Sequence, residues 1–138
     1  MNLTPLLTDN ITEILIMIIE FTQARQKILA QNINNVHLPG FMPKELEVGE
    51  FTSLLNNAID EHIRTARLIL CDTENIKFGC SCDFNVRPVN DLSSSELLRQ
   101  NPEEYIELQM NKLWENSLNQ RVAAEMLRQK SDFAFAAE

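Results

Sequence analysis

Three cysteines and two histidines are the residues of this sequence that could most readily do chemistry. Cys71, Cys80, Cys82 and His62 belong to the residue types that bind zinc in tetrahedral sites. However, the common pair of cysteines separated by two residues is absent. Cys80 and Cys82 instead occupy apolar positions of an alternating segment, where an unpaired cysteine behaves as a small hydrophobic residue. We therefore expect no metal ligands and no cofactor.

A cysteine nucleophile would need a histidine base beside it. Nothing in the sequence brings His37 or His62 close to a cysteine, and the chain has only 3 glycines to shape an oxyanion site. The odd number of cysteines is also a poor disulfide framework. We expect no catalytic residues and a protein that is not an enzyme.

The charge of the chain limits its possible partners. The 138 residues carry a net charge of −8 and contain no long basic block, so nucleic acid and anionic membrane surfaces are not expected partners. The apolar run Ile14–Ile19 is too short to span a bilayer and follows no basic segment. We expect no direct membrane insertion and no cleaved signal peptide.

Apolar residues at helical spacing predict a first helix over residues 10–36, about 40 Å long at 1.5 Å per residue. Asn10 and Glu13 resemble a capping box at its start. The first half of this helix is apolar on nearly every side, so it must be covered from several directions. Either a compact bundle encloses it, or neighbouring subunits supply the missing cover.

The chain then changes direction. Pro39 and Gly40 have the chemistry of a type II turn over residues 38–41, and an extended segment should follow over 41–49. A second amphipathic helix is predicted over 51–70. Strict alternation over 76–86 then predicts a strand, or a hairpin bent near Gly79, with one buried face.

A polar connection over 89–100 leads to the last helix, predicted over 102–131. Asn101 is a good N-cap for that helix, and Pro102 suits its first position. Two apolar rows mark the helix, namely Ile106, Met110, Leu113, Ala124, Leu127 and Trp114, Leu118, Val122, Met126. The sequence thus predicts a mainly α fold in which two long terminal helices pair as an antiparallel coiled coil. A small middle module of one helix plus a strand or hairpin separates them. The expected units are 1–40, 41–100 and 101–138.

Four amides, Gln31, Asn32, Asn34 and Asn35, gather near the end of the first helix, although amides are poor interior helix formers. They could form a frayed polar end. Alternatively, amides that face another helix fix register and partner choice, as one buried Asn does in coiled coils. Because apolar residues interleave with them, at least one amide should lie near the buried stripe.

The segment AQNINNVHLPGF, residues 30–41, resembles the signature of the bacterial flagellar basal-body rod and hook protein family, A-N-N-(I/L)-A-N-V-x-T-P-G-(Y/F). Gln31, Asn34 and Leu38 differ from the signature, and Met42 follows it where a basic residue is usual. Residues 107–118 are similar to the terminal helix of the proximal rod proteins within that family, although the alignment slips by one residue. The matching positions are Asn32, Ile33, Asn35, Val36, Pro39, Gly40 and Phe41 in the first segment, and Glu107, Met110, Lys112, Leu113, Glu115, Asn116 and Leu118 in the second.

The resemblance implies a structural subunit that is exported unfolded through the flagellar type III apparatus and assembles into the periplasmic rod. Implied partners are other rod proteins, a FliE-like adaptor, the membrane-supramembrane ring and the export gate. The expected interface comprises Ile14, Ile18, Phe21, Ile28, Asn32, Ile33, Asn35, Val36, Met110, Leu113, Asn116 and Leu118, with Pro39, Gly40 and Phe41 forming the turn. The alternative is a cytoplasmic helical adaptor, a protein-binding module unrelated to flagella.

Overall fold

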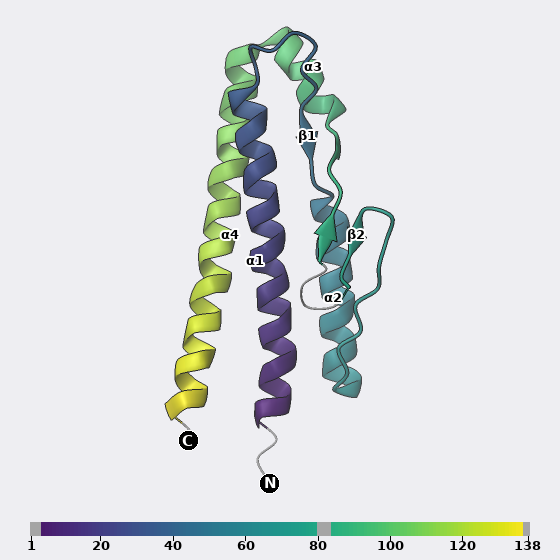
Figure 1. Ribbon diagram of the computed structural model, residues 1–138, viewed down its shortest axis with the longest axis vertical. Coiled ribbons are helices and arrows are strands. Elements are labelled where there is room, and N and C mark those ends of the chain that lie inside the picture. Colours follow the sequence, from purple (N-terminus) through teal and green to yellow (C-terminus); the bar gives the residue numbers. More distant parts are fainter. Residues whose placement is uncertain (1–3, 80–83, 137–138) are drawn as a thin grey trace.

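Two long helices dominate the computed structural model, which describes residues 4–79 and 84–136. Helix α1 spans Thr4–Asn34 and helix α4 spans Pro102–Ala136. They lie side by side, and the start of α1 and the end of α4 are at the same end of the molecule (Figure 1). The prediction of a mainly helical chain with long terminal helices is therefore confirmed.

Helix α1 begins earlier than the sequence predicted. Asn10 lies inside the helix, so the predicted capping box at Asn10 and Glu13 is wrong. The Asn10 amide Nδ2 instead lies 3.2 Å from Nδ1 of His62, near the far end of α2. This contact connects α1 to α2, and Asn10 does not cap the start of α1.

The turn at residues 38–41 has the predicted geometry. The Phe41 amide N–H donates to the Leu38 carbonyl over 3.2 Å, and Gly40 has a φ of 74°. Glycine suits this position because, at a positive φ, the Cβ of any other residue would crowd the backbone and glycine has no Cβ. The chain then continues into the short strand β1, Lys44–Glu45.

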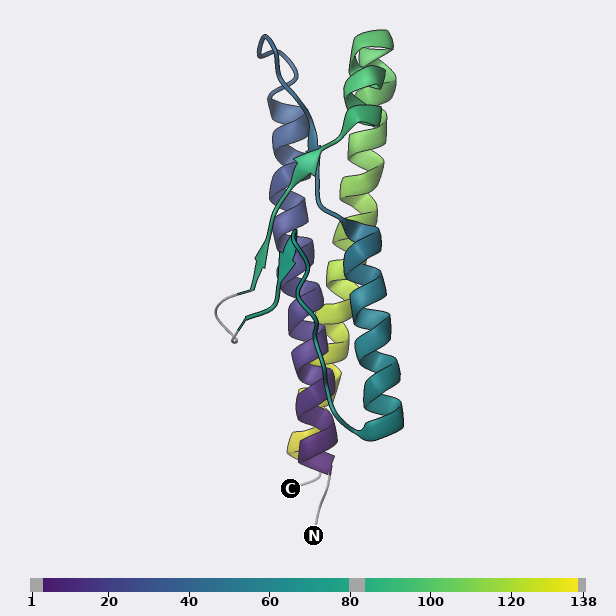
Figure 2. The same cartoon turned by 90° about the vertical axis from the view of Figure 1, so that its right-hand side faces the viewer.

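Helix α2, Val48–Thr65, starts and ends several residues before the predicted bounds of 51–70. It ends because Ala66 adopts a left-handed conformation, with φ 59°, and donates its N–H to the His62 carbonyl over 2.8 Å. The helix runs back along the N-terminal half of α1, as Figures 1 and 2 show. A stacked pair, Phe21 and Phe51, joins the two helices with ring centroids 4.0 Å apart.

The alternating segment forms a pair of short strands, as the hairpin alternative predicted. Strands β2, Ile76–Lys77, and β3, Asn85–Val86, are antiparallel. Gly79 follows β2 with a φ of 55°. Residues 80–83 lie outside the described ranges, so the prediction that Cys80 and Cys82 share a buried face stays a prediction.

The predicted polar connection contains a short strand and a helix. Strand β4, Val89–Asn90, pairs antiparallel with β1. Helix α3, Leu92–Gln100, follows and is capped by Asp91, whose Oδ1 accepts the Ser94 N–H over 3.1 Å. Asn101 then caps α4 as predicted, because its Oδ1 accepts the Glu104 N–H over 3.2 Å.

The core lies where α1, α2 and the hairpin meet. Its buried members come from all three elements and from the segment that connects α1 to α2, namely Ile14, Met17, Phe21, Leu46, Phe51, Leu55, Ile76 and Phe78. Figure 2 shows the hairpin and α2 both lying against α1. The chain thus covers much of its most apolar helix itself, as the bundle alternative expected. None of the helices in the described ranges combines the length and apolar content needed to cross a membrane.

Candidate assembly surface

One buried amide joins three parts of the chain near the C-terminal end of α1. Asn32 is only 2% exposed. Its Nδ2 donates to the Lys44 carbonyl over 2.7 Å and to Oε1 of Gln109 over 3.0 Å. Its Oδ1 accepts the Lys44 N–H over 3.0 Å, so the amide pairs with one residue of β1 much as a neighbouring strand would. Tyr105 adds a fourth bond, from its hydroxyl to the Asn32 carbonyl over 2.7 Å.

Hydrogen bonds continue from this amide toward α3. Gln109 donates through Nε2 to Oγ of Ser94 over 3.1 Å, and that hydroxyl donates to Oδ2 of Asp91 over 2.7 Å. Burial alone would raise the pKa of Asp91. The bonds from Ser94 and the charge of Lys112 outweigh burial, so the pKa of this carboxyl lies below its usual value. Asp91 therefore holds a negative charge between α3 and α4.

Charged side chains complete the network on its outer side. Arg25 donates to both carboxylate oxygens of Glu45, each over 3.0 Å, which is the strong bidentate geometry. Lys112 of α4 lies 3.5 Å from the same carboxylate and 3.3 Å from Asp91. Within the described residues no buried side-chain nitrogen or oxygen lacks a partner. The network therefore holds β1, α3 and α4 against α1.

Helix α4 presents a largely polar stripe to α1. Its most buried residues are Tyr105, Gln109, Asn116 and Ala123. Asn116 donates through Nδ2 to the Thr22 carbonyl of α1 over 2.7 Å. Burial is the main reason why the pKa of Tyr105 rises to about 12, and the charge of Asp91 adds to it. A buried amide or hydroxyl must find a partner, and here the partners belong to α1 and α3.

The apolar row of α4 consequently faces solvent. Trp114 is 68% exposed and Leu118 is 43% exposed. The full row repeats every fourth residue, as Met110, Trp114, Leu118, Val122 and Met126, and we call it the outer row. Large apolar side chains gathered on one helix are unusual on a monomer surface and mark interaction sites.

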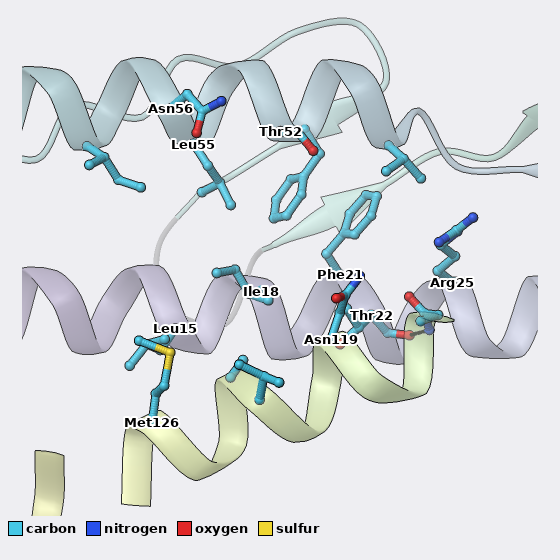
Figure 3. Close-up of a pocket in the computed structure, with 16 residues that line it drawn as sticks. Leu15, Ile18, Phe21, Thr22, Arg25, Thr52, Leu55, Asn56, Asn119 and Met126 are labelled. Carbon is cyan, nitrogen blue, oxygen red and sulfur yellow. Dashed lines mark hydrogen bonds between the residues drawn. The ribbon is translucent and has the colours of Figure 1, made fainter. Parts of the chain in front are cut away.

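A groove of about 350 Å³ lies beside the outer row. Leu55 of α2, Ile18 of α1 and Met126 of α4 line it, together with the stacked Phe21 and Phe51 (Figure 3). It occupies the side of α1 that lies between α2 and α4. An apolar groove bounded by three helices is the kind of surface on which a further amphipathic helix packs.

The predicted interface residues divide into three groups. Ile14, Phe21, Asn32 and Asn116 are buried within the chain. Ile18, Ile28, Ile33, Asn35, Val36, Leu113 and Phe41 are half-buried, whereas Met110, Leu118, Pro39 and Gly40 are exposed. In this arrangement the buried residues position the helices, and a partner would meet the exposed ones. The prediction omitted Trp114, Val122 and Met126, although their four-residue spacing was visible in the sequence.

The residues considered for metal chemistry do not converge in the described part of the chain. No group of three His, Cys, Asp or Glu side chains there could hold a metal ion. Cys71 is exposed in the loop between α2 and β2, while His62 contacts Asn10. Cys80 and Cys82 lie outside the described residues.

Comparisons with family models, with curated proteins and with solved structures give no match to this chain.

Proposed function

We propose that this protein is a structural, non-catalytic subunit of the proximal rod of the bacterial flagellar basal body, similar to the rod protein FlgB. It would leave the cytoplasm without a cleaved signal peptide and assemble in the periplasm. The observation that carries the proposal is the segment at residues 30–41, which resembles the rod and hook signature at seven positions.

The positions of that resemblance have defined physical tasks in this fold. Asn32 fixes β1 against α1 and α4 through its hydrogen bonds. Gly40 supplies the positive φ that reverses the chain after α1. A signature whose residues set the exit from a terminal helix fits a family that builds its shared core from such helices.

The two terminal helices form an antiparallel coiled coil in this proposal. The buried positions of α4 advance by four and seven residues, from Tyr105 to Gln109, Asn116 and Ala123, which follows one heptad-like face. Polar contacts such as that of Asn116 with the Thr22 carbonyl would fix the register of this pair. A polar contact between two helices buries less apolar surface than an apolar one, but it favours a single alignment of the helices.

Partners would be other rod proteins, a FliE-like adaptor, the membrane-supramembrane ring and the export gate. Contacts between unlike surfaces of successive subunits extend without closing and so build a helical tube. The first three members of the outer row, Met110, Trp114 and Leu118, and the groove between α2 and α4 offer two different apolar surfaces for such contacts.

A second candidate is a helical adaptor that binds one partner protein in the cytoplasm and has no link to flagella. The groove favours this candidate, because three helices of one chain already line it without any contribution from a neighbour. Both candidates use apolar contact surfaces and neither requires catalysis.

Deletion of the gene in the source bacterium tests the proposal and separates the two candidates. The rod proposal predicts loss of swimming and loss of hooks and filaments, because later parts cannot assemble on a missing rod. Complementation with the unaltered gene should restore both. Cells that swim normally and carry normal filaments after the deletion would refute the rod proposal and favour the adaptor.

A further inference from the structure

We propose that the segment 85–91, which contains β3 and β4, binds an extended acidic segment of a partner protein as an added strand. The binding surface is the outer edge of this segment, formed by the backbone groups that Val86, Pro88 and Asn90 direct away from β1 and β2. It is separate from the outer row of α4 and from the groove. The inference goes beyond the proposed function and does not depend on it.

Hydrogen bonds on the inner side of the segment show which residues face outward. The Arg87 N–H donates to the Asn75 carbonyl over 2.8 Å, and the Asp91 N–H donates to the Pro43 carbonyl over 2.9 Å. Along an antiparallel strand, residues that bond to one neighbour alternate with residues whose N–H and C=O point the other way. The odd-numbered residues of the segment therefore face β2 and β1, and the even-numbered residues form the outer edge.

The chain closes the far edges of β1 and β2 by itself. On β1, the Asn32 side chain bonds both the N–H and the C=O of Lys44. On β2, Ile76 donates its N–H to Oγ1 of Thr73 over 3.2 Å and accepts the Thr73 N–H over 2.8 Å. Among the described residues, no such bond is made at the outer edge of β3 and β4. Unpaired N–H and C=O groups in a row are a template for a further strand.

The position of Pro88 agrees with an edge that faces solvent. Proline has no N–H, so within sheets it occupies edge positions where that group would point to solvent. Pro88 lies at an outward position, midway between Val86 and Asn90. In Figure 2, β4 lies on the near side of the molecule in front of α1 and β1, and β3 lies toward the left. The outer edge thus faces away from α1.

Basic side chains give this surface a charge opposite to the net charge of −8 on the whole chain. Lys44, Lys77 and Arg87 are exposed, and none of them joins an ion pair among the described residues. The acidic residue of the short strands, Glu45, is already neutralised by its own ion pairs. Complementary charge therefore favours an acidic partner segment.

The edge specifies the backbone and one side chain of its partner. An added antiparallel strand can exchange two hydrogen bonds with Val86 and two with Asn90, and it can donate one to the Pro88 carbonyl. The partner residue opposite Arg87 would place its side chain on the same face, with Cβ atoms roughly 4.5–5.5 Å apart. A carboxylate at that position would pair with the guanidinium group.

A second copy of this edge is a poorer occupant than an acidic segment. Two antiparallel copies centred on Pro88 would oppose two residues that lack an N–H, so both central hydrogen bonds would be lost. They would also gather the basic side chains of both copies along one sheet. Proline on an edge strand is a common protection against such self-pairing.

Titration of the full-length chain with synthetic peptides tests the proposal. The probe is an eight-residue peptide of alternating threonine and glutamate with blocked ends, and the control has lysine in place of glutamate. Alternation places all charges on one face of a strand. In NMR spectra, the glutamate peptide should shift the amide signals of Val86 and Asn90, and at saturation it should slow their hydrogen exchange at least tenfold. The lysine peptide should do neither.

Methylated peptides test whether the backbone makes the contact. If glutamate lies opposite Arg87, the threonine N–H groups face the outer edge and the glutamate N–H groups point away from it. N-methylation of the threonines should therefore abolish binding, whereas N-methylation of the glutamates should leave it largely intact. Equal binding of the two methylated peptides would contradict strand addition.

Two protein variants test the surface from the other side. Arg87→Glu should weaken binding of the glutamate peptide several-fold, while Arg121→Glu, the same charge change on α4, should not. Pro88→Thr should tighten binding roughly two- to tenfold, because it supplies the missing N–H. Circular dichroism would establish that each variant keeps its helices.

Three results would overturn the proposal. The first is slow exchange of Val86 and Asn90 without peptide, which would mean that the chain itself covers the edge. The second is the absence of binding at millimolar glutamate peptide. The third is exchange that slows as the concentration of the protein alone rises, which would identify a second copy as the occupant.

Discussion

At the scale of single residues, one of the amides near the end of α1 is explained by its hydrogen bonds to the backbone of β1. The sequence indicated that at least one amide would lie near the buried stripe, and Asn32 does so at 2% exposed. The identity of its partners was beyond sequence reasoning, because Lys44 and Gln109 become neighbours only through the turn and the return of α4. The exposed Asn34 has no comparable role.

Replacing Asn32 by Leu should destabilise the protein, although Leu is the better helix former. The substitution leaves the Lys44 N–H and C=O and the Gln109 side chain without their partner, and an unsatisfied buried polar group costs roughly 1–3 kcal/mol. We expect a loss of about 2–3 kcal/mol in the free energy of unfolding, measured by urea denaturation.

Asn34→Leu provides the matched control, because Asn34 is exposed two residues further along the same helix. It should change the free energy of unfolding by less than about 0.5 kcal/mol, as surface substitutions usually do. Equal stability of the two variants would show that the hydrogen bonds of Asn32 do not hold β1 in place.

At the scale of elements, the long helices were predictable and the contacts between elements were not. Helical periodicity located α1, α2 and α4, while their ends differed by several residues because turns and tertiary contacts set them. Strands β1 and β4 have 2 residues each, too few for a pattern of alternation. They pair across about a third of the chain, so their neighbours are set by the fold.

The sequence did not indicate which side of α4 would contact α1. Polar residues such as Gln109 and Asn116 occupy that contact, because their hydrogen bonds reach α1 and α3. Met110 and Leu118 belong to the predicted interface and remain exposed, as they must be if they bind a partner.

The attachment of α2 to α1 should depend on Phe51. This side chain stacks on Phe21 and also lies 6.4 Å from the ring of Phe78, measured between centroids. Phe51→Ala should cost about 3–5 kcal/mol, the usual range for a buried Phe. Hydrogen exchange should show faster exchange along α2, while α1 and α4 change less.

Ile63→Ala is the control for this prediction, because it removes an apolar side chain from the exposed face of the same helix. It should leave the exchange of α2 almost unaltered. If Phe51→Ala also left that exchange unaltered, α2 would be held by contacts other than the stack of aromatic rings.

At the scale of the whole molecule, the chain encloses part of α1 and displays one side of α4. Its own α2 and hairpin bury Ile14, Met17 and Phe21, so a neighbouring subunit is not needed to cover them. What remains for partners on the helices is the outer row and the groove beside it. In the proposed function, α4 is therefore the main assembly element and α1 positions it.

The most direct test of this account is quantitative mass spectrometry of purified flagellar basal bodies. Cells lacking the chromosomal gene would produce the unaltered chain, Leu118→Glu or Ile63→Glu. We predict that the unaltered chain and Ile63→Glu are present in basal bodies, and that Leu118→Glu is depleted at least tenfold. Absence of the unaltered chain from intact basal bodies of swimming cells would contradict the account.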